Sequence, residues 1–207
     1  ERPRGRRPRT PLKHSKASRN DVFDIFPSAR INELFVEVYR VLKPGAHFYL
    51  YCDQETMFVA KPIGEDVGFK FWKPLIWDKM CIGMGYHYRA RYEFILFFEK
   101  GKRNLNDLSV PDVLCAPRVD RGYPTAKPVS VVETLIAQGT QPGELVVAPF
   151  MGSGSTGDAS VRLGRPFLGN DLGEAAQSRA RERLRVLGAP EMDEATLEGW
   201  THPKDEQ

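Results

Sequence analysis

The hydrophobic positions of the chain change period repeatedly, from the spacing of a helix to that of a strand. Ile31, Leu34 and Val38, for example, fall on one face of a helix that Pro44-Gly45 ends. The helices predicted in this way cover residues 31–42, 55–66, 128–139, 155–163 and 173–187. The predicted strands cover residues 47–52, 69–77, 91–98, 144–150 and 166–170. This alternation predicts an α/β sheet with helices on both faces.

Three segments depart from the alternation. Residues 102–126 are polar and without period, and we expect a connecting loop. Pro74 lies inside the strand at residues 69–77, where its missing N–H predicts a break or a sheet edge. Residues 83–90 form a glycine-hinged aromatic loop, either a lid or base-pocket wall, or a hairpin turn with its aromatic rings packed inward.

A glycine-rich turn joins a strand to a helix in the last third of the chain. Gly152, Gly154 and Gly157 fit the G-x-G-x-x-G spacing, and Asp171 ends the next strand about 20 residues after the first glycine. Glycines let the backbone turn tightly and approach a ligand, and the carboxylate can accept hydrogen bonds from two ribose hydroxyls. The unit therefore predicts a nucleoside site, although such a turn can also serve tight packing alone. No lysine follows the glycines, which excludes a P-loop.

The order of the elements is rotated relative to the usual nucleotide-binding fold. Only one helix follows Asp171 before a polar tail, so the rest of the sheet has to come from residues before 144, as in a circular permutation. We expect a basic, mobile arm at residues 1–20, a single domain at residues 21–188 and a polar tail at residues 189–207.

The composition is that of a soluble globular protein with one core. The 207 residues are 41% hydrophobic and 28% charged. No apolar run reaches the roughly 18 residues of a membrane span, and no secretory leader is recognisable. Three scattered cysteines without C-x-x-C spacing predict reduced thiols and a cytoplasmic location. The four histidines show no metal-ligand spacing, so we expect no metal site. The lack of an apolar run long enough to span a bilayer predicts no membrane partner.

The net charge of +3 is modest, but positive charge is concentrated in the first twenty residues. Prolines prevent a helix there, so we expect an extended or mobile segment. It is either a solvated end or an arm that contacts nucleic-acid phosphates with release of counterions. Further basic groups occur at Arg89 and Arg91 and at residues 100–103.

Five segments of the chain belong to one recognisable set. The loop Val147-Ala-Pro-Phe-Met-Gly-Ser-Gly-Ser-Thr-Gly157 is followed by Leu168-Gly-Asn-Asp171 and preceded by Tyr123-Pro-Thr-Ala-Lys-Pro-Val129. Val41-Leu-Lys-Pro-Gly45, with residues 47–53, and Tyr92-Glu-Phe-Ile-Leu-Phe-Phe98 occur earlier. Together, over most of residues 12–187, they resemble DNA amino-methyltransferases of the circularly permuted β type.

The resemblance implies a Rossmann-like, S-adenosylmethionine-dependent methyltransferase fold with a mostly parallel sheet. Its parts are expected at residues 21–103 (catalytic half), 104–124 (connector) and 125–188 (cofactor half). The implied reaction is methylation of an exocyclic base amine, adenine N6 more than cytosine N4, as in restriction–modification. The implied partner is double-stranded DNA with a flipped base, and monomer and homodimer both remain open.

The resemblance also assigns candidate residues. The cofactor loop is matched by Phe150, Gly152, Ser153, Gly154, Ser155 and Thr156, with Asp171 for the ribose and Thr125 and Lys127 near the methionine carboxylate. The candidate DNA contacts are Lys13, His14, Lys16 and Arg89. Three alternatives remain open: Phe150 as plain core, Asp171 as a helix N-cap and Lys127 as a solvated residue.

Two departures from the family pattern concern activity. The catalytic tetrapeptide, Asp/Asn/Ser-Pro-Pro-Tyr/Phe, is not in this chain; the family order places it upstream of Glu1, and a start at Glu rather than Met indicates a fragment or processed product. Ala148 stands where the family has Asp, a change that costs about 1.5–3 kcal/mol if the acid bound the cofactor. A non-catalytic DNA-binding relative is therefore the main alternative, and a nicotinamide-dependent oxidoreductase a remote one.

Overall fold

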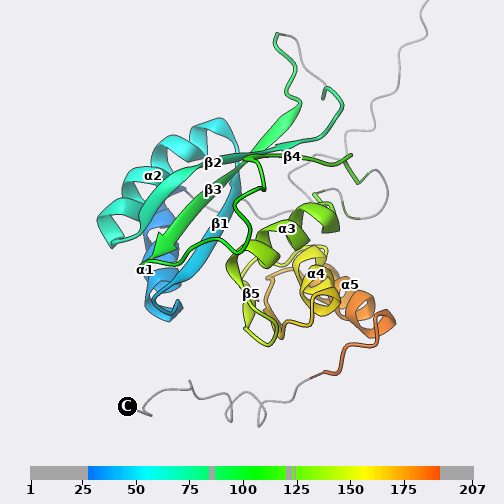
Figure 1. Ribbon diagram of the computed structural model, residues 1–207. Coiled ribbons are helices and arrows are strands. Elements are labelled where there is room, and N and C mark those ends of the chain that lie inside the picture. Colours follow the sequence, from blue (N-terminus) through cyan, green and yellow to red (C-terminus); the bar gives the residue numbers. More distant parts are fainter. Residues whose placement is uncertain (1–27, 84–86, 120–122, 124, 192–207) are drawn as a thin grey trace, which may run out of the picture.

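A computed structural model describes residues 28–83, 87–119, 123 and 125–191 (Figure 1). The helices are the short 3-10 turn η2 (Ser28–Arg30), α1 (Ile31–Val41), α2 (Gln54–Val67), α3 (Val129–Gly139), α4 (Ser155–Arg162) and α5 (Glu174–Val186). The strands are β1 (Ala46–Cys52), β2 (Lys70–Asp78), β3 (Tyr92–Lys100), β4 (Val113–Cys115), β5 (Val146–Ala148) and β6 (Phe167–Gly169). The expected basic arm and most of the expected polar tail lie outside the described residues. No helix in the described part is long and apolar enough to cross a bilayer.

The first four strands form one sheet in the order β1-β3-β2-β4, and β5 and β6 pair separately. β3 is antiparallel to both β1 and β2, whereas β4 is parallel to β2 and β5 to β6. The expected α/β fold is confirmed, but the expectation of a mostly parallel sheet is wrong for the described strands. The reason is that β2 and β3 follow each other as a hairpin, and strands joined without a crossover pair antiparallel.

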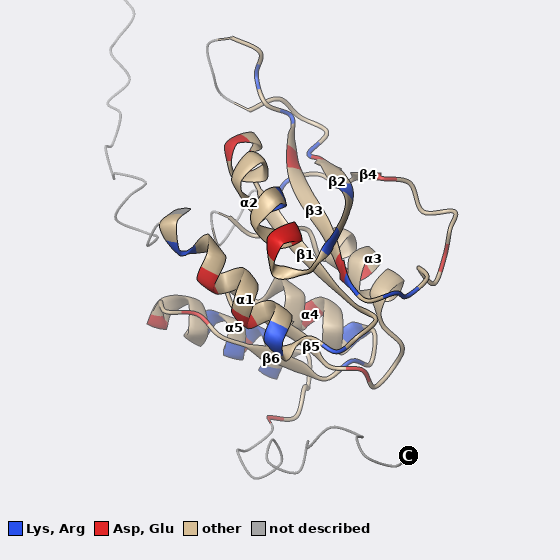
Figure 2. Cartoon of the chain, turned by 90° about the vertical axis from the view of Figure 1, so that its left-hand side faces the viewer, with Lys and Arg blue, Asp and Glu red and all other residues tan. Residues whose placement is uncertain are grey.

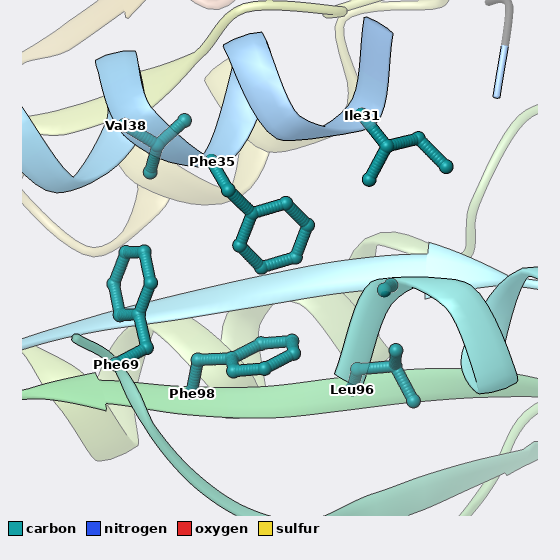
Figure 3. Packing of buried hydrophobic residues seen from close by; sticks show 7 residues of the cluster. Ile31, Phe35, Val38, Phe69, Leu96 and Phe98 are labelled. Carbon is teal, nitrogen blue, oxygen red and sulfur yellow. The ribbon is translucent and has the colours of Figure 1, made fainter. Parts of the chain in front are cut away.

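Helices cover both faces of the four-stranded sheet, as predicted. On one face, Phe35 of α1 packs edge-on against Phe98 of β3, with ring centroids 5.2 Å apart (Figure 3). On the other face, Leu135 of α3 belongs to a buried cluster with Trp77 and Ile95. Successive residues of a strand point to opposite faces, so Ile95 and Phe98 serve different layers.

The C-terminal half contains the predicted βαβ unit. β5, α4 and β6 follow one another, and β5 pairs with β6 in parallel register, with Val147 opposite Leu168. Each strand is shorter than predicted, three residues in both cases. α3 and α5 pack on either side of α4 (Figure 1).

The segment at residues 102–126 differs from the expected loop. It contains β4, which pairs with β2 from Ile76 opposite Val113 to Asp78 opposite Cys115. Three residues are too few to show a period, so the pattern alone could not reveal this strand. Pro74 lies outside the part of β2 that β4 reaches, with a register shift between Phe71 and Lys73 nearby. Of the predicted break or edge, the described strands show a local edge: Pro74 pairs with β3 on one side and has no described strand on the other, although β2 itself lies between β3 and β4.

Candidate cofactor site

A cavity of about 1030 Å³ lies between β1 and β5. Both strands line it along their whole length, and apolar residues of α1 and α3 line it as well. Among the described strands, β1 pairs only with β3 and β5 only with β6, so each presents an unpaired edge to the cavity. The predicted cofactor residues that line it are Thr125, Lys127, Phe150, Gly152, Ser153, Ser155 and Thr156. Small-molecule sites typically have volumes of about 300–1,000 Å³, so a nucleoside-sized ligand fits.

The three glycines of the loop have different roles. Gly152 lines the cavity with φ of +50°, a left-handed conformation that glycine adopts without steric cost. Gly154, with φ of +75°, packs so closely on α5 that an added Cβ would lie 2.9 Å from the Cβ of Ala180. A Cβ on Gly157 would lie 2.8 Å from the ring of Phe167 in β6. Close packing and backbone access to a ligand are thus both present in one motif.

Asp171 lies at the end of β6 and supports the loop rather than the cavity wall. One carboxylate oxygen accepts the Gly152 N–H at 2.9 Å, and the other accepts the Gly173 N–H at 3.0 Å. The alternative of an N-cap is wrong, because the N-cap of α5 is Gly173. A carboxylate offers about four lone-pair sites, so Asp171 retains capacity for ribose hydroxyls.

Phe150 and Thr125 are exposed at the cavity. Phe150 is 55% exposed, so the alternative that its ring belongs to the hydrophobic core is wrong. Thr125 is also exposed, two residues before Lys127. Ala148 lines the same cavity at the end of β5, and its carbonyl accepts the Asn170 N–H at 3.0 Å.

The alternative that Lys127 is a solvated surface residue is wrong. Its side chain is 25% exposed, and its Nζ lies 2.6 Å from the Glu93 carboxylate. Burial works to raise the pKa of Glu93, but Lys127 and Lys79 outweigh it and hold the pKa below its ordinary value. Sequence reasoning missed Glu93, although an acid next to the apolar run of residues 94–98 in strand β3 was a signal for it.

A second missed group anchors the loop from behind. Asp158 of α4 is buried and accepts Arg183 of α5 at 2.6 Å. Arg183 also donates to the Ser153 carbonyl at 3.2 Å, and the hydroxyls of Ser153 and Ser155 lie 2.9 Å apart. These contacts hold the predicted cofactor loop against α5.

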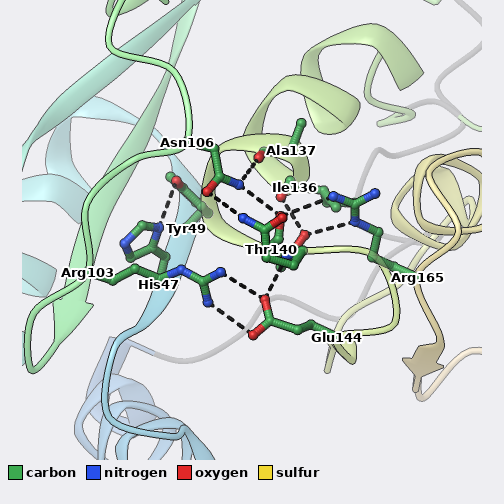
Figure 4. Close-up of polar contacts among 10 residues, drawn as sticks. His47, Tyr49, Arg103, Asn106, Ile136, Ala137, Thr140, Glu144 and Arg165 are labelled. Atoms are coloured by element: carbon green, nitrogen blue, oxygen red, sulfur yellow. Dashed lines mark hydrogen bonds and ion pairs between the residues drawn. The ribbon is translucent and has the colours of Figure 1, made fainter.

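A polar network near the start of β5 joins the two halves of the chain (Figure 4). Glu144 accepts two hydrogen bonds from Arg103, at 3.0 and 3.2 Å, and one from the Gln141 N–H at 2.7 Å. Asn106 donates to the carbonyls of Ala137 and Thr140 at the end of α3. The loop after β3 is thereby tied to the segment that leads into β5.

Only one of the predicted DNA contacts, Arg89, lies in the described part of the chain. Lys13, His14 and Lys16 lie outside the described residues. Arg89 is exposed on the β2–β3 hairpin and donates to the Gly83 carbonyl at 2.7 Å. Figure 2 shows basic positions on this projecting loop and along α5. Tyr88 is fully exposed, so inward packing of the loop's aromatic rings is wrong for this residue.

The described residues contain no group of three or more His, Cys, Asp or Glu side chains arranged to hold a metal ion. The thiol that lines the cavity, Cys52, has a pKa raised to about 12 by burial and by the nearby acids Asp53 and Glu93. Burial therefore keeps Cys52 in its protonated thiol form, which is not the nucleophilic form.

The chain is similar to known proteins in sequence and in fold. A family profile described as DNA methylase, of the N6/N4 type, matches residues 27–182. The type II methyltransferase M.HhaII of Haemophilus parahaemolyticus is 29% identical over 148 residues, which are 69% of this chain and 65% of that protein. M.HpaI of Haemophilus parainfluenzae is 26% identical over 181 residues, 74% of this chain and 58% of that protein. The chain therefore spans less than two thirds of the length of either relative.

Solved structures agree in fold. The complex of M1.HpyAVI with SAM superposes with a TM-score of 0.67 at 25% identity, covering 77% of this chain and 85% of that one. The cytosine-N4-specific PvuII DNA methyltransferase gives 0.65 at 16% identity, covering 83% and 76%, a likeness of fold alone. Since the family profile matches well over half of the residues, the chain belongs to the N6/N4 family of DNA methylases.

Proposed function

We propose that the chain is the S-adenosylmethionine-binding part of a DNA methyltransferase that acts on an exocyclic base amine. The observation that carries the proposal is the cavity beside β5, where the glycine loop meets Thr125 and Lys127. Family membership supplies the reaction class. The substrate is double-stranded DNA, with adenine N6 as the target in preference to cytosine N4, and the site of action is the bacterial or phage cytoplasm.

The cofactor, when bound, supplies a methyl group on a sulfonium, and the protein orients the reactants. The loop from Phe150 to Thr156 would hold the nucleoside, because most of these residues, Gly152 among them, line the cavity. Asp171 fixes that loop and would accept ribose hydroxyls. Lys127 would pair with the methionine carboxylate. Orienting reactants in this way lowers the barrier without a covalent intermediate on the enzyme.

The amine of the target base has to leave the duplex to reach such a cavity. The tetrapeptide that holds the amine in this family does not occur in the 207 residues. We therefore propose that this chain binds the cofactor and DNA. Methyl transfer requires the tetrapeptide in addition. Ala148 and the absent tetrapeptide favour a second candidate, a DNA-binding relative that no longer methylates.

Calorimetric titration with S-adenosylmethionine, with NAD as the comparison ligand, tests the proposal. Micromolar binding of the first ligand alone is the expected result. Binding of neither ligand would favour the non-catalytic relative, and binding of NAD alone would contradict the proposal. A Thr125→Ala variant should weaken S-adenosylmethionine binding, while Thr134→Ala, on the exposed face of α3, serves as the matched control.

A further inference from the structure

Glu93 and two lysines form a charged cluster at the edge of the cavity. The Nζ of Lys127 lies 2.6 Å from one Glu93 oxygen, and the Nζ of Lys79 lies 2.9 Å from the other. Lys79 follows β2, Glu93 belongs to β3 and Lys127 precedes α3. Three segments distant in the sequence therefore meet at one carboxylate.

Aromatic rings confine both ammonium groups. Lys127 Nζ lies 5.1 Å from the ring centre of Tyr51 and 5.6 Å from that of Trp77, and Lys79 Nζ lies 5.4 Å from that of Trp77. The Trp77 ring is itself fixed, since its Nε1 donates to the Ala116 carbonyl at 2.9 Å and the residue is 1% exposed. An ammonium within about 6 Å of a ring centre is attracted to its face.

The cluster has an unbalanced charge. Two lysines against one glutamate leave one positive charge, and the three side chains are only 21–29% exposed. Because Lys79 already neutralises Glu93, the carboxylate can hold Lys127 without strongly repelling an anion that approaches from the cavity. Lys127, Tyr51 and Thr125 line that cavity, whereas Glu93 does not.

We propose that Glu93, neutralised by Lys79, is a positioning residue that holds the Lys127 ammonium in place to receive the carboxylate of the cofactor's amino-acid part. The inference rests on the proposed function. A lysine side chain loses substantial rotamer freedom when it is ordered. Glu93 orders the Lys127 side chain before the ligand binds. Binding therefore does not have to include this loss of entropy. Preorganisation of this kind increases affinity without any contact between Glu93 and the ligand.

Ligands with and without the amino-acid part distinguish positioning from a general structural role. S-adenosylhomocysteine carries the carboxylate, and 5′-methylthioadenosine lacks it. Glu93→Gln should weaken binding of the first about tenfold, equivalent to about 1.4 kcal/mol, and leave the second unchanged. In a Lys127→Met background, Glu93→Gln should have no further effect. Asp112→Asn is the matched control, because Asp112 pairs with Lys73 of β2 on the exposed surface.

The outcomes separate the two proposals. If the unaltered chain binds neither ligand, the proposed function fails and the inference with it. If it binds both but Glu93→Gln weakens both equally or neither, the inference alone is overturned. Should Glu93→Gln fold poorly, Glu93→Asp, which keeps the charge but shortens its reach, has to show the same selective loss in smaller measure.

Discussion

The carboxylate of Asp171 accepts the backbone N–H of Gly152 at 2.9 Å, across 19 residues of sequence. This bond joins the end of β6 to the glycine loop that follows β5. A charged acceptor on a backbone N–H is stronger than a neutral one. The loop conformation and the predicted ribose contact therefore depend on the same side chain.

Replacing Asp171 with Ala should abolish most binding of S-adenosylmethionine. Removing a charged acceptor costs about 1.5–3 kcal/mol, or about ten- to a hundredfold in affinity. Calorimetry measures the loss, and Asp171→Asn, which keeps an acceptor without the charge, should lose less. Near-normal affinity of the alanine variant would refute the assignment.

Ala148→Asp restores the acid that the family has at the end of this strand. Since Ala148 lines the cavity, a carboxylate there should gain a charged hydrogen bond to the cofactor. We expect affinity to rise about tenfold, or about 1.4 kcal/mol. Titration of Ala148→Asn beside it separates charge from hydrogen bonding. Equal affinities of the Ala and Asp forms would show that position 148 does not contact the ligand.

Gly157→Ala should destabilise the fold without changing any polar group. Its Cβ would lie 2.8 Å from the Phe167 ring and 3.0 Å from Leu184, so α4 has to move away from β6. Overpacking of this kind costs about 1–3 kcal/mol of unfolding free energy, which urea denaturation measures. In a Phe167→Leu background the cost should shrink; an unchanged cost would mean that the ring is not the obstacle.

The free energy of unfolding should decrease in mild acid because of His47. Burial lowers its pKa below the ordinary 6.5, despite the opposing effect of the nearby Glu99 carboxylate. The unfolded state therefore binds a proton that the folded state resists, and stability declines as pH falls below about 6.5 towards the folded pKa. A His47→Phe variant should lose this component of the pH dependence between about pH 7 and 5. Parallel stability curves for the two proteins would contradict it.

The predicted DNA contacts should appear in the salt dependence of binding. Replacing Lys13 and Lys16 with Ala should reduce the slope of log K against log salt by about 1.8, since each phosphate contact contributes about 0.9. Fluorescence anisotropy with a duplex measures the slope, and Arg89→Ala should reduce it further. Lys61→Ala, which removes a lysine paired with Glu65 on α2, is the control. An unchanged slope in the double variant would exclude the arm as a DNA contact.

Local patterns in the sequence determined the elements around the site. The period of apolar residues predicted α1 and β3, and the glycine spacing with Asp171 predicted the βαβ unit. These signals succeed because a helix, a strand or a tight turn is specified by residues near one another in the chain. The family resemblance followed from the same local motifs.

Only the tertiary structure decided which distant groups meet. Lys127 pairs with Glu93, 34 residues away in sequence, and Asp158 pairs with Arg183, 25 residues away. Neither pair belongs to one local motif. The tertiary structure also decided strand direction. β3 lies between β1 and β2 and is antiparallel to β2, with which it forms a hairpin. The periodicity of a strand is the same whichever way its neighbour runs, so the sequence predicts that a strand exists but not its partner. Packing and charge burial, which act between segments far apart in sequence, make that choice.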